Sequence, residues 1–155
     1  MAKPKFTKYL SRDHIVGLKG GTRAAVFTEL IDYVARERSV DAEDIFAAVM
    51  AREKVMSTAV GGGLAIPHGR LAGFGPPMVV LGICRENIDD YSSLDGSPVR
   101  LVLLVLVDYM DFELHLELLS SVAGTFLTNQ ALVDDLMRNL DNPDEVMRLL
   151  EAGAK

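Results

Sequence analysis

The stretch from Ser57 to Arg70, STAVGGGLAIPHGR, contains the residues whose types and spacing could support chemistry. Three glycines precede a short apolar step, and Pro67 stands directly before His68. Proline fixes its own φ and biases the preceding residue toward an extended conformation, while glycines leave room for an incoming group. Because a neutral imidazole can act as a nucleophile, we expect a short strand that delivers a reactive His68 to an exposed bend. A surface histidine without a role is the alternative.

The glycines do not form a known nucleotide-binding loop. A P-loop needs a Lys-Ser/Thr pair after its last glycine, whereas Leu64-Ala65-Ile66-Pro67 follows here. A dinucleotide fingerprint needs a helix that begins at the glycines, and Pro67 would interrupt that helix. We therefore expect no nucleotide and no other cofactor at this stretch.

The other two histidines, His14 and His115, have different surroundings. His115 lies on the apolar stripe of an expected helix, where most histidines are hydrogen-bonded core residues. It also lies in the first turn after a strand that ends near Asp108, and such a position at the carboxyl end of a strand favours an anion. His14 precedes a short first strand and is interpreted as structural or exposed. No HxxH or HExxH spacing is present, so a metal site is not expected.

Composition and charge exclude several classes of function. The 155 residues carry a net charge of −6 without a run rich in lysine or arginine, which argues against nucleic-acid binding. The acidic balance fits a partner with a basic surface. The longest apolar run, 99–107, contains Arg100 and is too short to span a membrane, and the N-terminus does not resemble a signal peptide. Cys84 lies in an apolar stretch and is interpreted as a buried, inert thiol. We expect a cytoplasmic protein with no membrane insertion.

Helices are predicted at both ends of the chain. Thr22 is expected to cap a helix whose apolar residues follow three-and-four spacing, and a second helix should run from Asp41 to about Glu53. In the last third, helices are expected from about residue 112 to 126, over 130–140, and from the N-cap Asn142 to about residue 153.

The middle of the chain is predicted to form β-strands. The segments 64–66, 78–83 and 99–107 are apolar, and the last two lack polar alternation, which is typical of strands covered on both faces. Asp95-Gly96 predicts a turn between the last two of these strands. Together with the helices, this pattern predicts a single α/β domain with helices on each side of its sheet.

Three runs of the sequence carry a family resemblance. AREKVMSTAVGGGLAIPHGR, DGSPVRLVLLVLV and HLELLSSVAGTF resemble the EIIA domain of the fructose/mannitol type, part of the bacterial phosphoenolpyruvate-dependent phosphotransferase system. The free-standing relative in this family is the nitrogen-regulatory EIIA. The resemblance covers about residues 10 to 152. It implies one domain over residues 1–155, with a mixed β-sheet flanked by helices on both faces.

The resemblance also implies a mechanism. His68 would accept a phosphoryl group from an HPr-type phosphocarrier, then pass it to an EIIB protein or keep it as a regulatory mark, without metal or cofactor. His115 matches the second histidine of the family and would contact the phosphoryl oxygens. Arg52 matches the family arginine, whose guanidinium can pair with phosphate, although a surface ion pair remains the alternative. A backbone carbonyl is expected to hold one ring nitrogen of His68, leaving the other free to attack.

Nearby residues have expected supporting roles. Ser57 and Thr58 should shape the loop through local hydrogen bonds, and Glu53 is interpreted as structural. Leu71 and Phe74 are candidates for a docking patch around His68, or else fold back onto the core.

Two departures from the family pattern are present. The segment 108–111 is acidic where relatives often have a proline, and its carboxylates would repel a phosphorylated His68 if they face the site. Gly62 stands where a larger residue is more common, which could loosen the loop.

Three roles are compatible with these residues. The chain has no linker to an EIIB domain or a permease, which favours a regulatory, nitrogen-type EIIA acting on target proteins. The second is a sugar-specific EIIA that donates phosphate to a separate EIIB for fructose- or mannitol-like uptake. The third is an interaction module whose histidine is never phosphorylated.

Overall fold

The computed structural model describes residues 3–153 and contains one six-stranded sheet in the order β1-β5-β6-β3-β2, with β4 also pairing with β6. Strands β5 and β6 are antiparallel, whereas β1 is parallel to β5 and both β3 and β4 are parallel to β6, so the sheet is mixed. The short β2 completes the sheet by antiparallel pairing with β3. The strands are β1 (Ile15–Leu18), β2 (Ala59–Gly61), β3 (Leu64–Ala65), β4 (His68–Leu71), β5 (Met78–Cys84) and β6 (Leu101–Asp108).

The helices begin where their capping residues predict. The side chains of Thr22, Asp41 and Asn142 accept hydrogen bonds from first-turn backbone N–H groups, which confirms the predicted N-caps Thr22 and Asn142 and the helix start after Asp41. The second helix extends past the expected end at Glu53, and the helix expected over 130–140 is shorter. The helical segments are η1 (Lys5–Tyr9), η2 (Arg12–His14), α1 (Arg23–Arg38), α2 (Ala42–Val55), α3 (Phe112–Thr128), α4 (Leu132–Arg138) and α5 (Pro143–Ala152).

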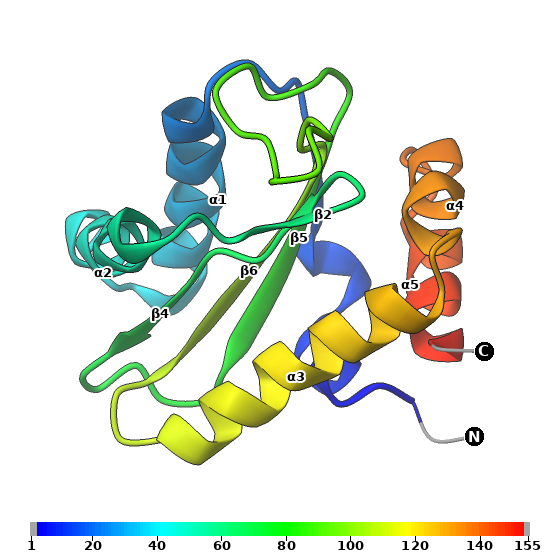
Figure 1. Cartoon of the computed structure of the whole chain (residues 1–155). Coiled ribbons are helices and arrows are strands. Elements are labelled where there is room, and N and C mark those ends of the chain that lie inside the picture. Colours follow the sequence, from blue (N-terminus) through cyan, green and yellow to red (C-terminus); the bar gives the residue numbers. More distant parts are fainter. Residues whose placement is uncertain (1–2, 154–155) are drawn as a thin grey trace.

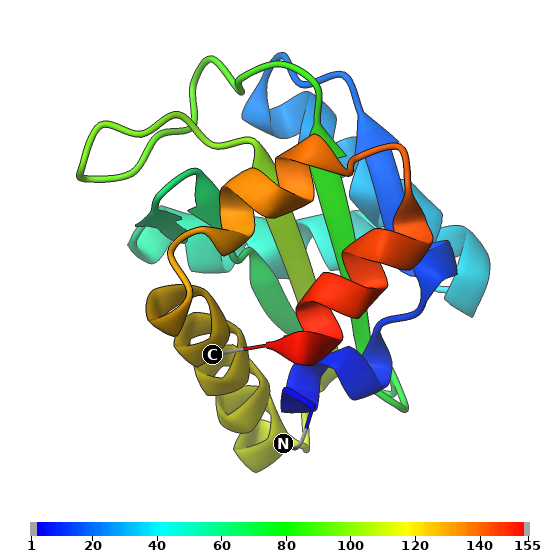
Figure 2. The same cartoon turned by 90° about the vertical axis from the view of Figure 1, so that its right-hand side faces the viewer.

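Helices cover the sheet on both faces, as predicted. Figure 1 shows α1 and α2 on one side of the strands and α4 and α5 on the other, with α3 crossing the lower edge. In Figure 2, α4 and α5 lie in front of the strands. Each face has its own apolar core, and every residue of β5 is buried because both faces are covered. The chain is thus an α/β fold with a mixed sheet. Within residues 3–153, no helix is long and apolar enough to cross a membrane.

The segment 64–71 forms an interrupted strand beside β6. β3 pairs with the start of β6 and β4 pairs with its end, while Ile66 and Pro67 lie between them. The N–H of Ile66 donates to the carbonyl of Thr58 at 3.0 Å, and the carbonyl of Pro67 accepts from Val105 N–H at 3.0 Å. Proline has no N–H to give to the ladder, so the interruption falls where no donor is lost.

The prediction of an exposed bend at His68 is therefore wrong. His68 is the first residue of β4, opposite Val105 in the register, and its side chain is buried. The strand was predicted correctly, but it continues past the proline because β6 supplies pairing partners on the far side.

Candidate functional site

The backbone fixes the imidazole of His68. Its Nδ1 lies 2.8 Å from the carbonyl oxygen of Ile66, two residues earlier in the chain. A carbonyl can only accept, so Nδ1 carries the hydrogen and Nε2 keeps its lone pair. The expected backbone carbonyl is therefore present, and the structure identifies Nε2 as the free nitrogen.

His115 lies beside His68. The two ring centroids are 5.1 Å apart with an interplanar angle of 57°, and Phe112 stacks on the other side of His115 at 6.2 Å. His115 is in the first turn of α3, where its backbone N–H donates to the carbonyl of Asp111. Its Nδ1 is buried without a hydrogen-bond partner in the described structure. A buried polar atom without a partner is uncommon, so His115 differs from a hydrogen-bonded core histidine.

Both imidazoles are held in the neutral form. Burial is the main cause that lowers the pKa of His68; the Ile66 hydrogen bond partly opposes it, and the positive charge of Arg52 lowers the pKa by a smaller amount. Burial also lowers the pKa of His115 to about 4, with contributions from His68, Arg70 and Arg52. A neutral ring is the form that can attack an electrophile.

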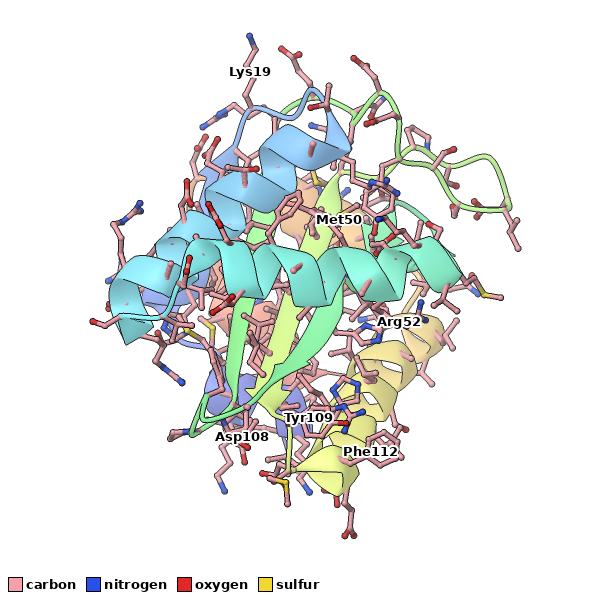
Figure 3. All side chains as sticks on the ribbon, turned by 90° about the vertical axis from the view of Figure 1, so that its left-hand side faces the viewer. Lys19, Met50, Arg52, Asp108, Tyr109 and Phe112 are labelled. Carbon is pink, nitrogen blue, oxygen red and sulfur yellow. The ribbon has the colours of Figure 1, made fainter. Side chains whose placement is uncertain are left out.

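Arg52 comes from the last turn of α2. Its Nη1 donates to the carbonyl of Met56 at 2.8 Å, and no carboxylate in residues 3–153 lies within 4.0 Å of its guanidinium. The alternative of a surface ion pair is thus not what this structure shows. Figure 3 shows Arg52 at the end of α2 that faces α3, on the same side of the molecule as Tyr109 and Phe112.

A cleft of about 810 Å³ brings Arg52 and His68 to one surface. One wall is the loop that precedes β2, and another is the loop between β5 and β6. Three apolar residues that line it, Met56, Val60 and Leu94, are largely exposed. The other lining residues are Ser57, Thr58, Ala59, Gly61, Ile66, Ser92, Ser93, Asp95, Leu119 and Ala123.

Comparison with known proteins identifies the family. Residues 8–153 match the family described as the phosphoenolpyruvate-dependent sugar phosphotransferase system, EIIA 2. The chain belongs to this EIIA family. The match extends beyond the 10–152 inferred from the sequence and confirms the resemblance.

The relatives of this EIIA chain include regulatory and sugar-specific proteins. A nitrogen regulatory protein of Pseudomonas aeruginosa is 35% identical over 137 residues, covering 88% of this chain and 87% of the relative. A fructose-specific EIIA component of Haloferax volcanii is 30% identical over 135 residues, covering 86% and 78%. The crystal structure of the nitrogen regulatory protein IIA-Ntr of Neisseria meningitidis superposes with a TM-score of 0.84, at 34% identity, covering 93% of this chain and 97% of the other.

A buried carboxylate supports the loop that forms the EIIA cleft. Glu53 accepts hydrogen bonds from the backbone N–H of Thr58 at 3.3 Å, from the Thr58 hydroxyl and from Tyr91 at 3.0 Å, with Arg23 3.8 Å away. These contacts fasten α2 to the two loops beside the cleft, which agrees with a structural role for Glu53. The hydroxyl of Ser57 accepts from Ala59 N–H at 3.2 Å, so Ser57 and Thr58 both shape the loop as predicted.

The candidate docking residues Leu71 and Phe74 are in the core. Both are buried in the cluster between the sheet and the helices α1 and α2, so their proposed exposure is wrong. Leu71 is the last residue of β4 and Phe74 lies just after the strand, and both pack on the core as the alternative predicted. The exposed apolar residues beside the cleft are instead Met56, Val60 and Leu94.

The acidic segment 108–111 is a turn between β6 and α3. The Asp108 carboxylate accepts from the backbone N–H groups of Gly75 at 3.0 Å and Met110 at 3.1 Å, and these hydrogen bonds lower its pKa. Asp111 is the residue before α3 and is exposed. The Asp108 carboxylate therefore stabilises the turn that delivers α3 and His115.

The remaining titratable candidates lie outside the EIIA site. His14 is structural, because its Nδ1 contacts the carbonyl of Val79 at 3.2 Å. Cys84 is buried in the core, and burial raises the pKa of its thiol to about 11, which agrees with an inert cysteine. In the part of the chain that the structure describes, no three His, Cys, Asp or Glu side chains converge as a metal site would require.

One charged residue at this site was not singled out from the sequence. Arg70 is two residues after His68 on β4, and its guanidinium lies over the rings of Tyr109 and Phe112. The signal that could have found it is the strand period: residues two apart on a strand project to the same face.

Proposed function

We propose that this EIIA protein is a histidine phosphocarrier that accepts a phosphoryl group on Nε2 of His68 from an HPr-type carrier. The observation that supports this most directly is the hydrogen bond from Nδ1 to the Ile66 carbonyl, since it leaves Nε2 as an unprotonated nitrogen. The adjacent cleft gives a donor protein access, and its exposed apolar wall residues suit a protein partner.

The proposed phosphoryl transfer needs only His68 and the phosphohistidine of the carrier as reactants. The Nε2 lone pair of His68 forms a bond to phosphorus while the P–N bond of the carrier's phosphohistidine breaks, and that electron pair returns to the carrier's imidazole. The hydrogen on Nδ1 of His68 stays bonded to Nδ1 and hydrogen-bonded to the Ile66 carbonyl throughout. Because little covalent assistance is needed, alignment and charge stabilisation would provide most of the catalysis.

His115 and Arg52 would stabilise the transferred group. The phosphoryl oxygens carry negative charge, and the unpartnered Nδ1 of His115 gives the site one polar atom that is not already used by the protein. Arg52 adds a guanidinium without a carboxylate partner within 4.0 Å in residues 3–153. Guanidinium groups suit phosphate because their N–H donors match its geometry.

We infer a regulatory, nitrogen-type role for the phosphorylated protein. The support is the similarity to nitrogen regulatory proteins at 34–35% identity over most of the chain. Its phosphorylation state would then change which cytoplasmic target proteins it binds. The alternative is a sugar-specific EIIA that donates to EIIB, supported by the fructose-specific relative and by the solved complex of mannitol EIIA with phosphorylated EIIB from Escherichia coli, which shares the fold at 20% identity.

Phosphotransfer from phosphoenolpyruvate through Enzyme I and an HPr-type carrier tests this function. Intact mass measured under neutral conditions should show an acid-labile gain of one phosphoryl group in the wild type and in His14→Ala. His68→Ala should show no gain. An unmodified wild type, beside a control EIIA that is modified by the same carrier, would leave the non-phosphorylated interaction module as the better function.

The two phosphocarrier roles differ in the fate of the phosphoryl group. A sugar-specific protein should transfer it to a fructose- or mannitol-type EIIB within seconds, whereas a regulator should retain it in the same mixture. Isolating the phosphorylated protein and mixing it with purified EIIB separates the two roles.

A further inference from the structure

The strand geometry places Arg70 on the same face of the sheet as His68. A Cβ added to Gly69 would lie 3.3 Å from the Cβ of Ala48, so the intervening position faces α2. Because side chains alternate along a strand, His68 and Arg70 both project away from α2, toward the side where α3 begins. The two residues stand opposite Val105 and Val107 of β6, so their spacing is fixed by the parallel ladder.

Two aromatic rings hold the guanidinium of Arg70. Its Cζ lies 4.6 Å from the ring centroid of Tyr109 and 4.7 Å from that of Phe112, and its Nη1 donates to the carbonyl of Tyr109 at 3.2 Å. The negative faces of the aromatic rings attract the guanidinium cation and favour this position. Figure 3 shows Tyr109 and Phe112 together at the start of α3.

The charge of this clamped arginine is not neutralised by a nearby carboxylate. Among the residues from 3 to 153, no Asp or Glu oxygen lies within 4.0 Å of the Arg70 guanidinium. Asp108 is close in sequence to Tyr109, but its carboxylate is hydrogen-bonded to the backbone of Gly75 and Met110. A held, uncompensated cation in a protein of net charge −6 creates a local positive potential.

The clamp is connected to the histidine pair by direct stacking. Phe112, which contacts Arg70, also stacks on His115 at 6.2 Å with nearly parallel rings, and His115 lies 5.1 Å from His68. The positive charge of Arg70 also contributes to the lowered pKa of His115, so its field reaches that imidazole. Arg52 acts on both imidazoles from α2.

We propose that Arg70, clamped between Tyr109 and Phe112, supplies a second guanidinium charge that stabilises the phosphoryl group carried on His68. The inference rests on the proposed phosphocarrier function and adds a residue to it. Arg70 acts through its charge, and the aromatic rings serve to keep that charge close to the histidine pair. The effect is on the equilibrium of transfer, because the charge favours the phosphorylated state of this protein over that of the donor.

The experiment measures the equilibrium ratio of phosphorylated EIIA protein to phosphorylated carrier in the wild type and three variants. Arg70→Gln removes the charge, Arg70→Lys keeps it, and Arg36→Gln on the exposed side of α1 is the matched charge control. We expect Arg70→Gln to lower the ratio about three- to tenfold at low salt, as for a unit charge several ångströms away in a medium of intermediate dielectric. High salt should reduce the difference, while Arg70→Lys and Arg36→Gln should stay within about twofold of the wild type.

Two outcomes would overturn the inference while leaving the phosphocarrier function intact. One is a ratio for Arg70→Gln equal to that for Arg36→Gln. The other is a loss in Arg70→Lys as large as in Arg70→Gln, which would indicate that the stacked shape matters and the charge does not. A wild type that accepts no phosphoryl group would instead overturn the proposed function and this inference with it.

The pKa of His115 is a second readout that needs no phosphotransfer. It distinguishes an electrostatic role of Arg70 from a purely structural one. An NMR titration of unphosphorylated Arg70→Gln should show a higher pKa for His115 than in the wild type, since a nearby cation has been removed. Arg36→Gln should leave that pKa unchanged. An unchanged His115 pKa in a folded Arg70→Gln protein would show that the field of Arg70 does not reach the site.

Discussion

At the scale of single residues, the two imidazoles of the site differ in how the protein uses their nitrogens. His68 gives Nδ1–H to the carbonyl of Ile66, so its tautomer is set by the backbone and survives changes in nearby side chains. His115 keeps a buried Nδ1 without a partner. The proposed nucleophile is thus fixed by the backbone, and the imidazole beside it keeps an unsatisfied polar atom, which is uncommon in a folded protein.

The lowered pKa values give a prediction for pH. Because burial disfavours the charged ring, both histidines should stay neutral when the pH falls below 6.5, and His115 should protonate only near pH 4. A ¹⁵N NMR titration of the imidazoles, assigned with His68→Ala, measures this directly. The rate of phosphoryl acceptance should accordingly be level from pH 8 to 6.5 and decline as the pH falls through the lowered pKa of His68. A midpoint for His115 at or above 6.5 would contradict the arrangement described for the site.

At the scale of elements, the interruption between β3 and β4 decides where the proposed nucleophile, His68, lies. Pro67 has no N–H to donate to β6, but its carbonyl accepts from the N–H of Val105, so the hydrogen bonds to β6 continue past the interruption. The carbonyl of Ile66, the residue before the proline, accepts from the imidazole of His68. The position of the Pro-His motif therefore depends on hydrogen bonds to the neighbouring strand β6. These pairing partners are not visible in the motif's own sequence.

Packing of α1 on the sheet gives a prediction at this scale. A Cβ added to Gly82 of β5 would lie 2.8 Å from Cδ1 of Leu18 and 3.1 Å from Cδ2 of Leu30, so Gly82→Ala should overpack this layer. We expect it to lower the free energy of unfolding by about 1–3 kcal/mol in urea denaturation. Gly17→Ala on the neighbouring β1 is the control, since nothing lies within 4 Å of the added Cβ, and it should be neutral or slightly stabilising. Equal losses in both variants would refute the packing argument.

At the scale of the whole molecule, the two apolar cores share one sheet. Leu104 of β6 is buried against α1 and α2, whereas its neighbour Leu103 is buried in the core with α3, α4 and α5. The helices on each face pack against the same strands, so neither core can form unless the shared sheet is folded. The two cores should therefore unfold together.

Truncation in either core tests this coupling. Leu103→Ala and Leu104→Ala should each lower the free energy of unfolding by about 2–5 kcal/mol, because each leaves a cavity in a packed interior. Far-ultraviolet and near-ultraviolet circular dichroism should still report one coincident transition in urea. Separate transitions by the two probes would mean that the layers unfold independently.

The sequence by itself determined the main elements and singled out His68 as the proposed nucleophile. Strand and helix patterns depend on spacings of two to four residues, and the N-caps Thr22 and Asn142 each depend on one side chain next to its own helix, so these features were predicted from local rules. The apolar runs of β5 and β6 likewise predicted a sheet covered on both faces. His68 was identified because its proline and glycines adjoin it in the chain.

Only the tertiary structure decided what surrounds that nucleophile. The parallel pairing of β4 with β6 brings His68 beside His115, and it brings Arg70 beneath the rings of Tyr109 and Phe112. The same folding turned Leu71 into the core, against the sequence-based docking candidate. These contacts join residues far apart in the chain, and their geometry is set by the register between strands and by the packing of helices. No local spacing encodes either quantity, so they follow only when the whole chain has folded.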